Sequence, residues 1–285
     1  MEAIQINDNE QLDKLAQEFR YVITDIICRA GGGHIGGSLS VVEIIITLYY
    51  RIMNFRPDQP AWEDRDRLVL SKGHAGPALY TALAYQGFFE KSWLPTLNQN
   101  GTNLPSHVDQ QKTPGIDQTA GSLGQGLSCA LGLALAGRIK NRKNRIFCVI
   151  GDGESQEGQI WEAAMFAGKH KLDNLIVIND YNKMQIDGTT DEIVSLEPLP
   201  DKWRSFGWEV FETDGHNWDE IYSRLNEAIQ VTGKPSIIIA HTVKAKGNKC
   251  VEGQVASHHI AVATDDDHQK FMEGVYPRGD IELPY

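Results

Sequence analysis

The segment spanning residues 146–188 constrains the fold most strongly, because two uninterrupted apolar runs flank a single helical pattern. Runs of this kind are typical of strands that are buried on both faces of a parallel sheet. The first run, 146–150, ends just before Asp152, and the second, 175–178, ends shortly before Asn182. In a right-handed strand–helix–strand crossover, the carboxyl ends of the two strands are neighbours. We therefore expect Asp152 and Asn182 to lie side by side at one edge of a sheet.

These two side chains predict a divalent metal site. A carboxylate and an amide oxygen are hard ligands suited to Mg²⁺, which usually keeps a water and takes phosphate oxygens as well. The amide of Gly153, at the start of the following helix, can face a diphosphate with the positive end of the helix dipole behind it. Glycines on both sides of Asp152 let a diphosphate approach closely. The alternative is that Asp152 only caps the helix and Asn182 belongs to a turn, which the second strand and the interval between the two residues disfavour.

The rest of the chain predicts an α/β fold, a parallel sheet flanked by helices, in a single domain over residues 1–285. Further strands are expected at 68–70, 208–211 and 236–240, with helical patterns between them. An extended segment begins at about residue 241. Glycines gather in four loops at junctions between elements, and loops of this kind converge at the edge of α/β sheets where ligands bind.

Capping signals predict several helix boundaries. Ser40 and Glu43 have the spacing of a capping box. Pro77 opens and Gly87 closes a second helix, and Asn217 caps a third. The GGGHIG sequence fits the GxGxxG pattern, but a long amphipathic helix rather than a strand precedes it, so we reject a dinucleotide site there.

Composition excludes several classes of protein. No stretch approaches the roughly 18 apolar residues of a membrane helix, and the polar, acidic N-terminus lacks the layout of a secretory signal. The net charge of −11 argues against a nucleic-acid surface. The four cysteines show no CxxC spacing, which favours free thiols in a reducing cytoplasm over disulfides or zinc.

The metal-site segment also carries a specific resemblance. GDGESQEGQIWEAAMFAG and DYNKMQIDG resemble the transketolases rather than other thiamine diphosphate enzymes. The similarity runs from GGGHIGG to residues 257–259 and covers the N-terminal half of a transketolase. It implies the diphosphate-binding domain of the thiamine diphosphate fold, with ketol transfer as its activity and thiamine diphosphate and Mg²⁺ as cofactors.

The resemblance implies individual ligands. Metal ligands of the family match Asp152, Asn182 and Met184, the last through its backbone carbonyl only. LSKGHAGPALY contains the match to a diphosphate-binding histidine, and GSL replaces the family's GPL block, with serine in place of proline. The cofactor-binding positions implied are His74, Gly121, Ser122, Leu123, Asp152, Gly153, Asn182 and His258.

Three histidines match catalytic positions of the family. The GHIG sequence resembles the GHPG motif and places His34 against substrate hydroxyls, although isoleucine replaces proline. His107 lies where the family has a GHPE histidine, in the altered context Ser-His-Val-Asp. Near residues 257–259, reading forward assigns His258 and reading backward assigns His259; we assign His258. The remaining histidines, expected to be surface or satisfied core residues, are His170, His216, His241 and His268.

Two further features have open interpretations. Small residues recur every four positions and leave a smooth stripe on one helix, which predicts close packing either within the domain or at a subunit interface, as in transketolases: Gly124, Ser128, Gly132 and Ala136. Lys244 and Lys246 follow a predicted strand and could touch phosphate, but solvated lysines are the favoured interpretation.

The second half of a transketolase has no counterpart in this chain. The glutamate that activates the cofactor lies there in the family, and by resemblance Glu157 matches only an interface glutamate. We therefore predict a split enzyme in which a C-terminal subunit supplies the pyrimidine-binding domain, in an α2β2 assembly. The alternatives are one subunit of an α-ketoacid dehydrogenase, a deoxyxylulose-phosphate synthase fragment and a non-catalytic thiamine-binding remnant. Pentose and hexose phosphates are the default sugars, with apulose phosphate or a sulfonated sugar left open.

Overall fold

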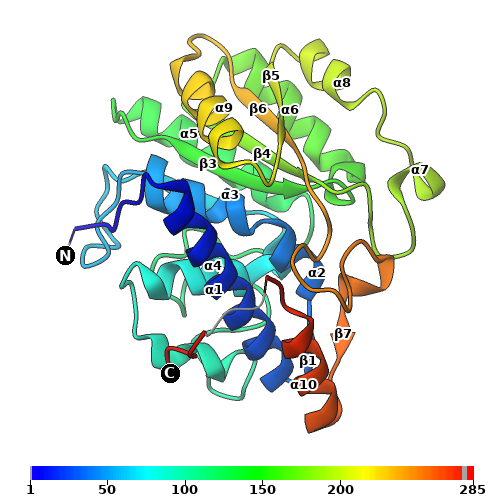
Figure 1. Ribbon diagram of the computed structural model, residues 1–285. Coiled ribbons are helices and arrows are strands. Elements are labelled where there is room, and N and C mark those ends of the chain that lie inside the picture. Colours follow the sequence, from blue (N-terminus) through cyan, green and yellow to red (C-terminus); the bar gives the residue numbers. More distant parts are fainter. Residues whose placement is uncertain (1, 278–280) are drawn as a thin grey trace.

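The computed structural model describes residues 2–277 and 281–285 and is built around a five-stranded parallel sheet (Figure 1). The strand order is β2-β3-β4-β6-β5. This confirms the predicted α/β fold, with every predicted strand present. The strands are β2 (Arg67–Leu70), β3 (Ile146–Gly151), β4 (Leu175–Tyr181), β5 (Glu209–Asp214) and β6 (Ser236–His241).

Helices cover both faces of this sheet, which explains the continuous apolar runs of β3 and β4. Phe147 and Val149 point into a core formed with α1, α3, α4 and α9, whereas Cys148 and Ile150 face α5, α6 and α8. The helices are α1 (Asn9–Arg29), α2 (Ile35–Ser40), α3 (Val42–Thr47), α4 (Gly76–Tyr85), α5 (Gln125–Ile139), α6 (Gly158–His170), α7 (Thr190–Ile193), α8 (Leu199–Ser205), α9 (Trp218–Gln230) and α10 (Asp265–Gly274).

Two of the three predicted helix boundaries are confirmed. Pro77 lies in the first turn of α4, and Gly87 follows the helix with a φ of +86°. The side chain of Asn217 accepts hydrogen bonds from the backbone at the start of α9. The capping box at Ser40 and Glu43 is wrong, because Ser40 ends α2 and its hydroxyl donates to a buried aspartate, while Glu43 forms a buried ion pair.

A small antiparallel pair lies outside the main sheet. It joins β1 (Gly32–Gly33), next to the end of α1, to β7 (Ile260–Ala261) near the C-terminus. A Cβ on Gly32 would lie 2.2 Å from the Ile260 carbonyl oxygen, so the close pairing requires glycine. Because α1 leads directly into this pair, the GGGHIG sequence does not follow a strand of the five-stranded sheet, as a dinucleotide site requires.

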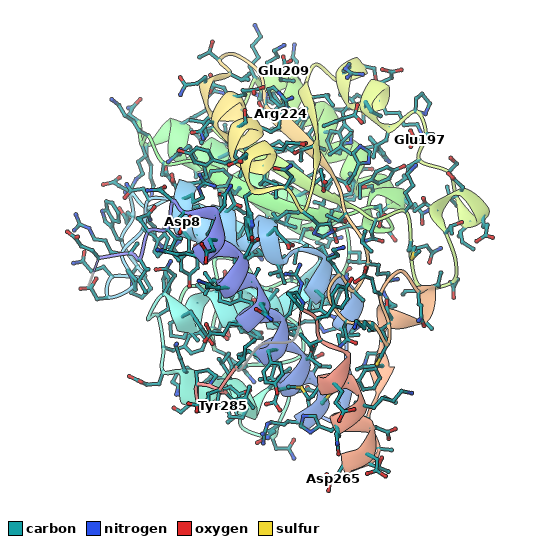
Figure 2. All side chains as sticks on the ribbon, viewed as in Figure 1. Asp8, Glu197, Glu209, Arg224, Asp265 and Tyr285 are labelled. Atoms are coloured by element: carbon teal, nitrogen blue, oxygen red, sulfur yellow. The ribbon has the colours of Figure 1, made fainter. Side chains whose placement is uncertain are left out.

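Figure 2 labels exposed charged residues, among them Asp265 at the lower tip of the molecule. Within the described residues, the helices are all too short or too polar to cross a membrane.

Candidate active site

The carboxyl edge of the sheet brings the two predicted metal ligands together. Gly151 of β3 is paired with Asp180 of β4, so both strands end at the same level, and Asp152 and Asn182 follow them. The amide of Met184 donates to Asp152 Oδ2 at 3.2 Å and to Asn182 Oδ1 at 3.1 Å. Both side chains line one cavity of about 200 Å³. The two residues therefore lie side by side, as the crossover predicts.

The orientation of the Asn182 amide is fixed by its neighbour. Its Nδ2 donates to Asp180 Oδ2 at 3.3 Å, which leaves Oδ1 to accept from the same Met184 amide that donates to Asp152. Asp180 is itself buried and accepts from Ser40 and Thr242 as well as from Lys72. Asp180 therefore orients the Asn182 amide through a hydrogen bond, and Asp180 is itself held in place by hydrogen bonds from other residues.

Asp152 is a buried carboxylate that forms no direct ion pair with another described residue. It is 3% exposed, and no lysine, arginine or histidine nitrogen in the described part of the chain lies within 4 Å of it. Burial and the negative charge of Asp180 raise the pKa of Asp152 to about 7. A divalent cation would supply the missing charge, so the residues present fit Mg²⁺. The described residues hold no group of three or more His, Cys, Asp or Glu side chains placed for a metal. The ligands predicted here are of another kind, because they comprise one carboxylate, one side-chain amide oxygen and one backbone carbonyl.

Two lysines face the same cavity, and sequence analysis missed or misread both. Lys72, in the loop after β2, is 2% exposed and paired with Asp180. Lys244, after β6, is 3% exposed, so the prediction of a solvated side chain is wrong. Burial lowers the pKa of Lys244 to about 8. The signal in the sequence that could have identified them is their position just after parallel strands. The two positive side chains together make the cavity suited to an anion.

Five histidines converge beside this cavity. His34, between β1 and α2, lies at the centre of the cluster. Its ring centroid is 4.9–5.4 Å from the rings of four others, His74, His107, His258 and His259. Burial and the neighbouring histidines lower the pKa of His34 to about 4. A neutral imidazole both donates and accepts hydrogen bonds, as recognition of sugar hydroxyls requires.

The geometry also separates His258 from His259. The ring of His258 lies 5.3 Å from that of His74, and both line the cavity with Asp152. Burial, followed by the charges of Lys244 and Lys72, lowers the pKa of His258 to about 4. His259 contacts the His34 ring at 4.9 Å. His258 therefore lines the cavity of the predicted metal ligands, which favours it for the cofactor position, whereas His259 is not among the residues that line it.

The remaining predicted cofactor positions differ in their relation to the cavity, which Gly153 lines. Leu123 lines the cavity, whereas Gly121 and Ser122 are exposed beside it. Glu154, which sequence analysis did not assign, is buried and accepts from the amides of Gly124 at 2.8 Å and Gly151 at 3.0 Å. It therefore ties the loop before α5 to the loop after β3.

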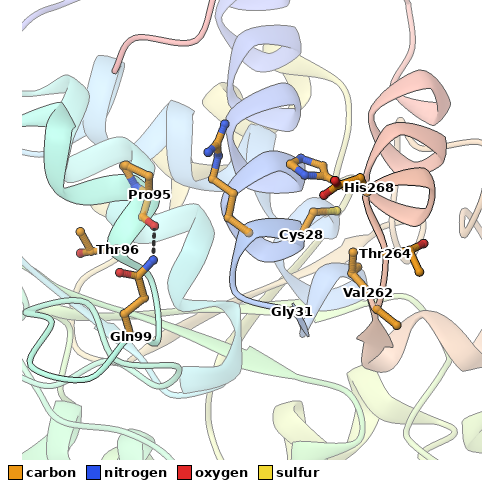
Figure 3. Close-up of a pocket in the computed structure, with 11 residues that line it drawn as sticks. Cys28, Gly31, Pro95, Thr96, Gln99, Val262, Thr264 and His268 are labelled. Carbon is orange, nitrogen blue, oxygen red and sulfur yellow. Dashed lines mark hydrogen bonds between the residues drawn. The ribbon is translucent and has the colours of Figure 1, made fainter.

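A wider pocket of about 920 Å³ lies beside the end of α1 (Figure 3). It is lined by Cys28, Thr264 and His268, and by a loop in which Gln99 donates to the Pro95 carbonyl at 3.0 Å. None of the predicted ligands or clustered histidines lines it. We therefore place the candidate active site in the smaller cavity.

The comparisons with known proteins agree with this geometry. Residues 12–284 match the sequence model described as transketolase, thiamine diphosphate binding domain. The chain belongs to the transketolase family. As a transketolase-type transferase, it carries the thiamine diphosphate-binding part of the enzyme, and the predicted fold and family are confirmed.

Several transketolases are similar to the chain. The 6-deoxy-6-sulfo-D-fructose transketolase subunit of Clostridium sp. (strain MSTE9) is 55% identical over 254 residues, which cover 89% of this chain and 92% of the relative. One of the apulose-4-phosphate transketolase subunits of Actinobacillus succinogenes is 41% identical, covering 90% and 93%. The solved transketolase of Campylobacter jejuni has a TM-score of 0.87 at 31% identity, covering 98% of this chain and 45% of that one. The chain thus spans less than half the length of this solved transketolase.

Proposed function

We propose that this chain is the N-terminal subunit of a two-subunit transketolase, which transfers a two-carbon ketol unit from a ketose to an aldose with thiamine diphosphate and Mg²⁺. The observation that carries the proposal is the pairing of Asp152 and Asn182 at adjacent strand ends, in the cavity that His74 and His258 also line. Relatives of similar length that are named as transketolase subunits support the split.

One group of residues in this chain would bind the cofactor and another would bind the sugar. Asp152, Asn182 and the Met184 carbonyl would hold Mg²⁺, and the Gly153 amide and Lys244 would face the diphosphate. When bound, thiamine diphosphate supplies the nucleophilic carbon and the electron sink that cleavage beside a ketose carbonyl requires.

The histidine cluster would bind the reacting end of the sugar. The His34 ring lies within 5.4 Å of the rings of His74 and His258, which line the cavity, so we propose that its imidazole contacts a hydroxyl next to the carbonyl. Because its pKa is lowered to about 4, His34 is neutral near pH 7 and can accept a hydroxyl proton. His107 and His259 would then hold the hydroxyls further along the chain.

A partner chain is supported by the surface of the molecule. On α5, Gly132 and Ala136 of the small-residue stripe are exposed, which favours a subunit interface over packing within the domain. Large apolar side chains accompany them on α5 and α6: Ile139 is 74% exposed, Met165 50% and Phe166 42%. We propose that this face forms a subunit contact within an α2β2 assembly, and that the chain works in the cytoplasm.

The donor sugar is proposed from the relatives. The sulfofructose transketolase subunit is 55% identical to this chain over the 254 aligned residues, against 41% over 258 residues for the apulose-4-phosphate relative. We therefore propose 6-deoxy-6-sulfo-D-fructose as the donor. The altered contexts of His107 and His258 would then reflect this specialised substrate.

The test is an assay of ketol transfer with this chain alone, with its C-terminal partner alone and with both. We expect activity only from the mixture, with a higher kcat/KM for the sulfosugar than for fructose 6-phosphate or apulose 4-phosphate. Full activity from the single chain would refute the split. A preference for either phosphate would refute the donor but not ketol transfer.

A further inference from the structure

The backbone segment 242–247 brings Lys244 to the cofactor cavity and is hydrogen-bonded to a charge cluster that lies outside the cavity lining. This cluster, which we call the anchor triad, consists of Arg20 from α1, Glu43 from α3 and His216 from the loop between β5 and α9. None of its members lines the cofactor cavity. The proposed function therefore gives the anchor triad no role.

Glu43 is the centre of the anchor triad. Its Oε1 accepts from Arg20 Nη2, and its Oε2 lies 3.0 Å from His216 Nδ1. Burial opposes ionisation of this carboxyl, but Arg20 and His216 outweigh it and lower the pKa of Glu43 to about 2. The cluster is thus a buried and charged structure, of the kind that loses much when one member is removed.

Each partner of Glu43 forms a hydrogen bond with the 242–247 backbone. The amide of Val243 donates to His216 Nε2 at 2.8 Å, so Nε2 is the acceptor and Nδ1 carries the proton that points at Glu43. Arg20 Nε donates to the carbonyl of Lys246 at 2.9 Å. One carboxylate therefore sets two anchor points, on either side of Lys244.

The ammonium of Lys244 depends on this backbone for its position. It donates to two carbonyl oxygens at long range, those of Gln185 at 3.3 Å and Val255 at 3.4 Å. The next residue, Ala245, is buried with a φ of +58° and donates its amide to the Gly36 carbonyl at 3.0 Å. Such a conformation persists where the surroundings hold it in place.

We propose that Glu43, acting through His216 and Arg20, is a positioning residue that sets Lys244 against the diphosphate of the cofactor. The proposal rests on the cofactor site of the proposed function. Loss of the Glu43 charge frees both anchor points, so the 242–247 segment shifts and Lys244 leaves its position. The effect reaches the diphosphate only through Lys244.

A double-mutant cycle in the reconstituted two-subunit complex tests this. The measurement is the affinity for thiamine diphosphate with Mg²⁺ and for thiamine, which lacks the diphosphate, in wild type, Glu43→Gln, Lys244→Met and the double variant. We expect each single change to weaken thiamine diphosphate about tenfold and the double variant to be no weaker than Lys244→Met, because residues that act as one unit are not additive. Thiamine affinity should not change.

A matched control is available in α1. Asp25 is also a buried carboxylate between an arginine and a histidine, with Arg29 Nε at 2.6 Å and His268 Nε2 at 2.9 Å, but it does not contact the 242–247 segment. Asp25→Asn should lower the thermal midpoint like Glu43→Gln and leave thiamine diphosphate affinity unchanged. If Glu43→Gln does not fold, His216→Gln takes its place in the cycle.

Additive losses, equal losses for thiamine and thiamine diphosphate, or an equal loss in Asp25→Asn would overturn the positioning role. Unchanged affinity for thiamine diphosphate in Lys244→Met would show that Lys244 does not contribute to diphosphate binding, which would also overturn the proposal. Ketol transfer by the wild-type complex, measured on the same preparations, decides the proposed function separately.

Discussion

Replacing Asp152 by Asn should stabilise the isolated chain while destroying its metal-dependent cofactor binding. The pKa of Asp152 is raised to about 7 in the folded chain, whereas the ordinary pKa, taken for the unfolded chain, is 3.8. Ionisation therefore costs the folded chain free energy as the pH rises through this window. At 1.36 kcal/mol per pKa unit, the full cost above pH 7 is roughly 4 kcal/mol.

The substitution also removes one hydrogen bond. Asp152 accepts from the amides of Gly153, at 2.8 Å, and Met184, and the single oxygen of an asparagine can serve only one of them. Because the Met184 amide also donates to Asn182 Oδ1 at 3.1 Å, it keeps a partner when the new oxygen serves Gly153, and the loss is that of one hydrogen bond, about 0.5–1.5 kcal/mol. The net expectation is a gain of about 3 kcal/mol in the free energy of unfolding at pH 8. Near pH 4 the gain should disappear, because Asp152 is then neutral in the folded chain.

Urea unfolding in the presence of EDTA at pH 8 and at pH 4 measures the stability, and calorimetric titration of the two-subunit complex measures cofactor binding. Affinity for thiamine diphosphate with Mg²⁺ should fall at least a hundredfold, since loss of outer-shell partners alone costs about 10–100-fold. Asp117, buried and paired with Arg65 and Arg67, is the control, and Asp117→Asn should destabilise the chain. A destabilised Asp152→Asn chain at pH 8, or one that binds the cofactor normally, would refute the reasoning.

Three further predictions follow from the cavity and the exposed face. His34→Asn should lower kcat for ketol transfer about 10²–10⁴-fold with little change in thiamine diphosphate affinity; an equal loss in affinity would place His34 on the cofactor instead. Because the pKa values of His34 and His258 are lowered to about 4, kcat/KM should fall with decreasing pH only below about pH 6. A fall centred near pH 6.5 that disappears when His34 is replaced would contradict this. Met165→Glu, on the exposed face of α6, should reduce assembly mass in size-exclusion light scattering and leave the folded chain intact, whereas unchanged mass would exclude this face as an interface.

The parts of the site that could be predicted from the sequence depend on local patterns. Two apolar runs and the handedness of a crossover were enough to bring Asp152 beside Asn182, because parallel pairing fixes which strand ends meet. The histidines His34 and His74 lie in glycine-flanked loops whose family motifs are readable in the sequence. Only the structure shows that five histidines, His259 among them, share one cluster.

The parts that sequence analysis missed depend on partners far away in the chain. Ser40 and Glu43 have capping-box spacing, but their hydrogen-bond partners lie on β4 and α1, and these tertiary contacts outweigh the local signal. Lys244 was interpreted as a solvated lysine because nothing nearby in sequence shows that β6 delivers it to a closed cavity. Lysine burial of this kind is set by tertiary packing, which residue type alone does not reveal.

The most direct test of the account is the position of the metal in the assembled enzyme. A crystal of the two-subunit complex grown with Mn²⁺ in place of Mg²⁺ and with thiamine diphosphate would show the ion in an anomalous difference map. We predict a single peak between the side-chain oxygens of Asp152 and Asn182, at about 2.0–2.3 Å from each. A peak elsewhere, with those two oxygens bonded only to protein, would contradict the central claim.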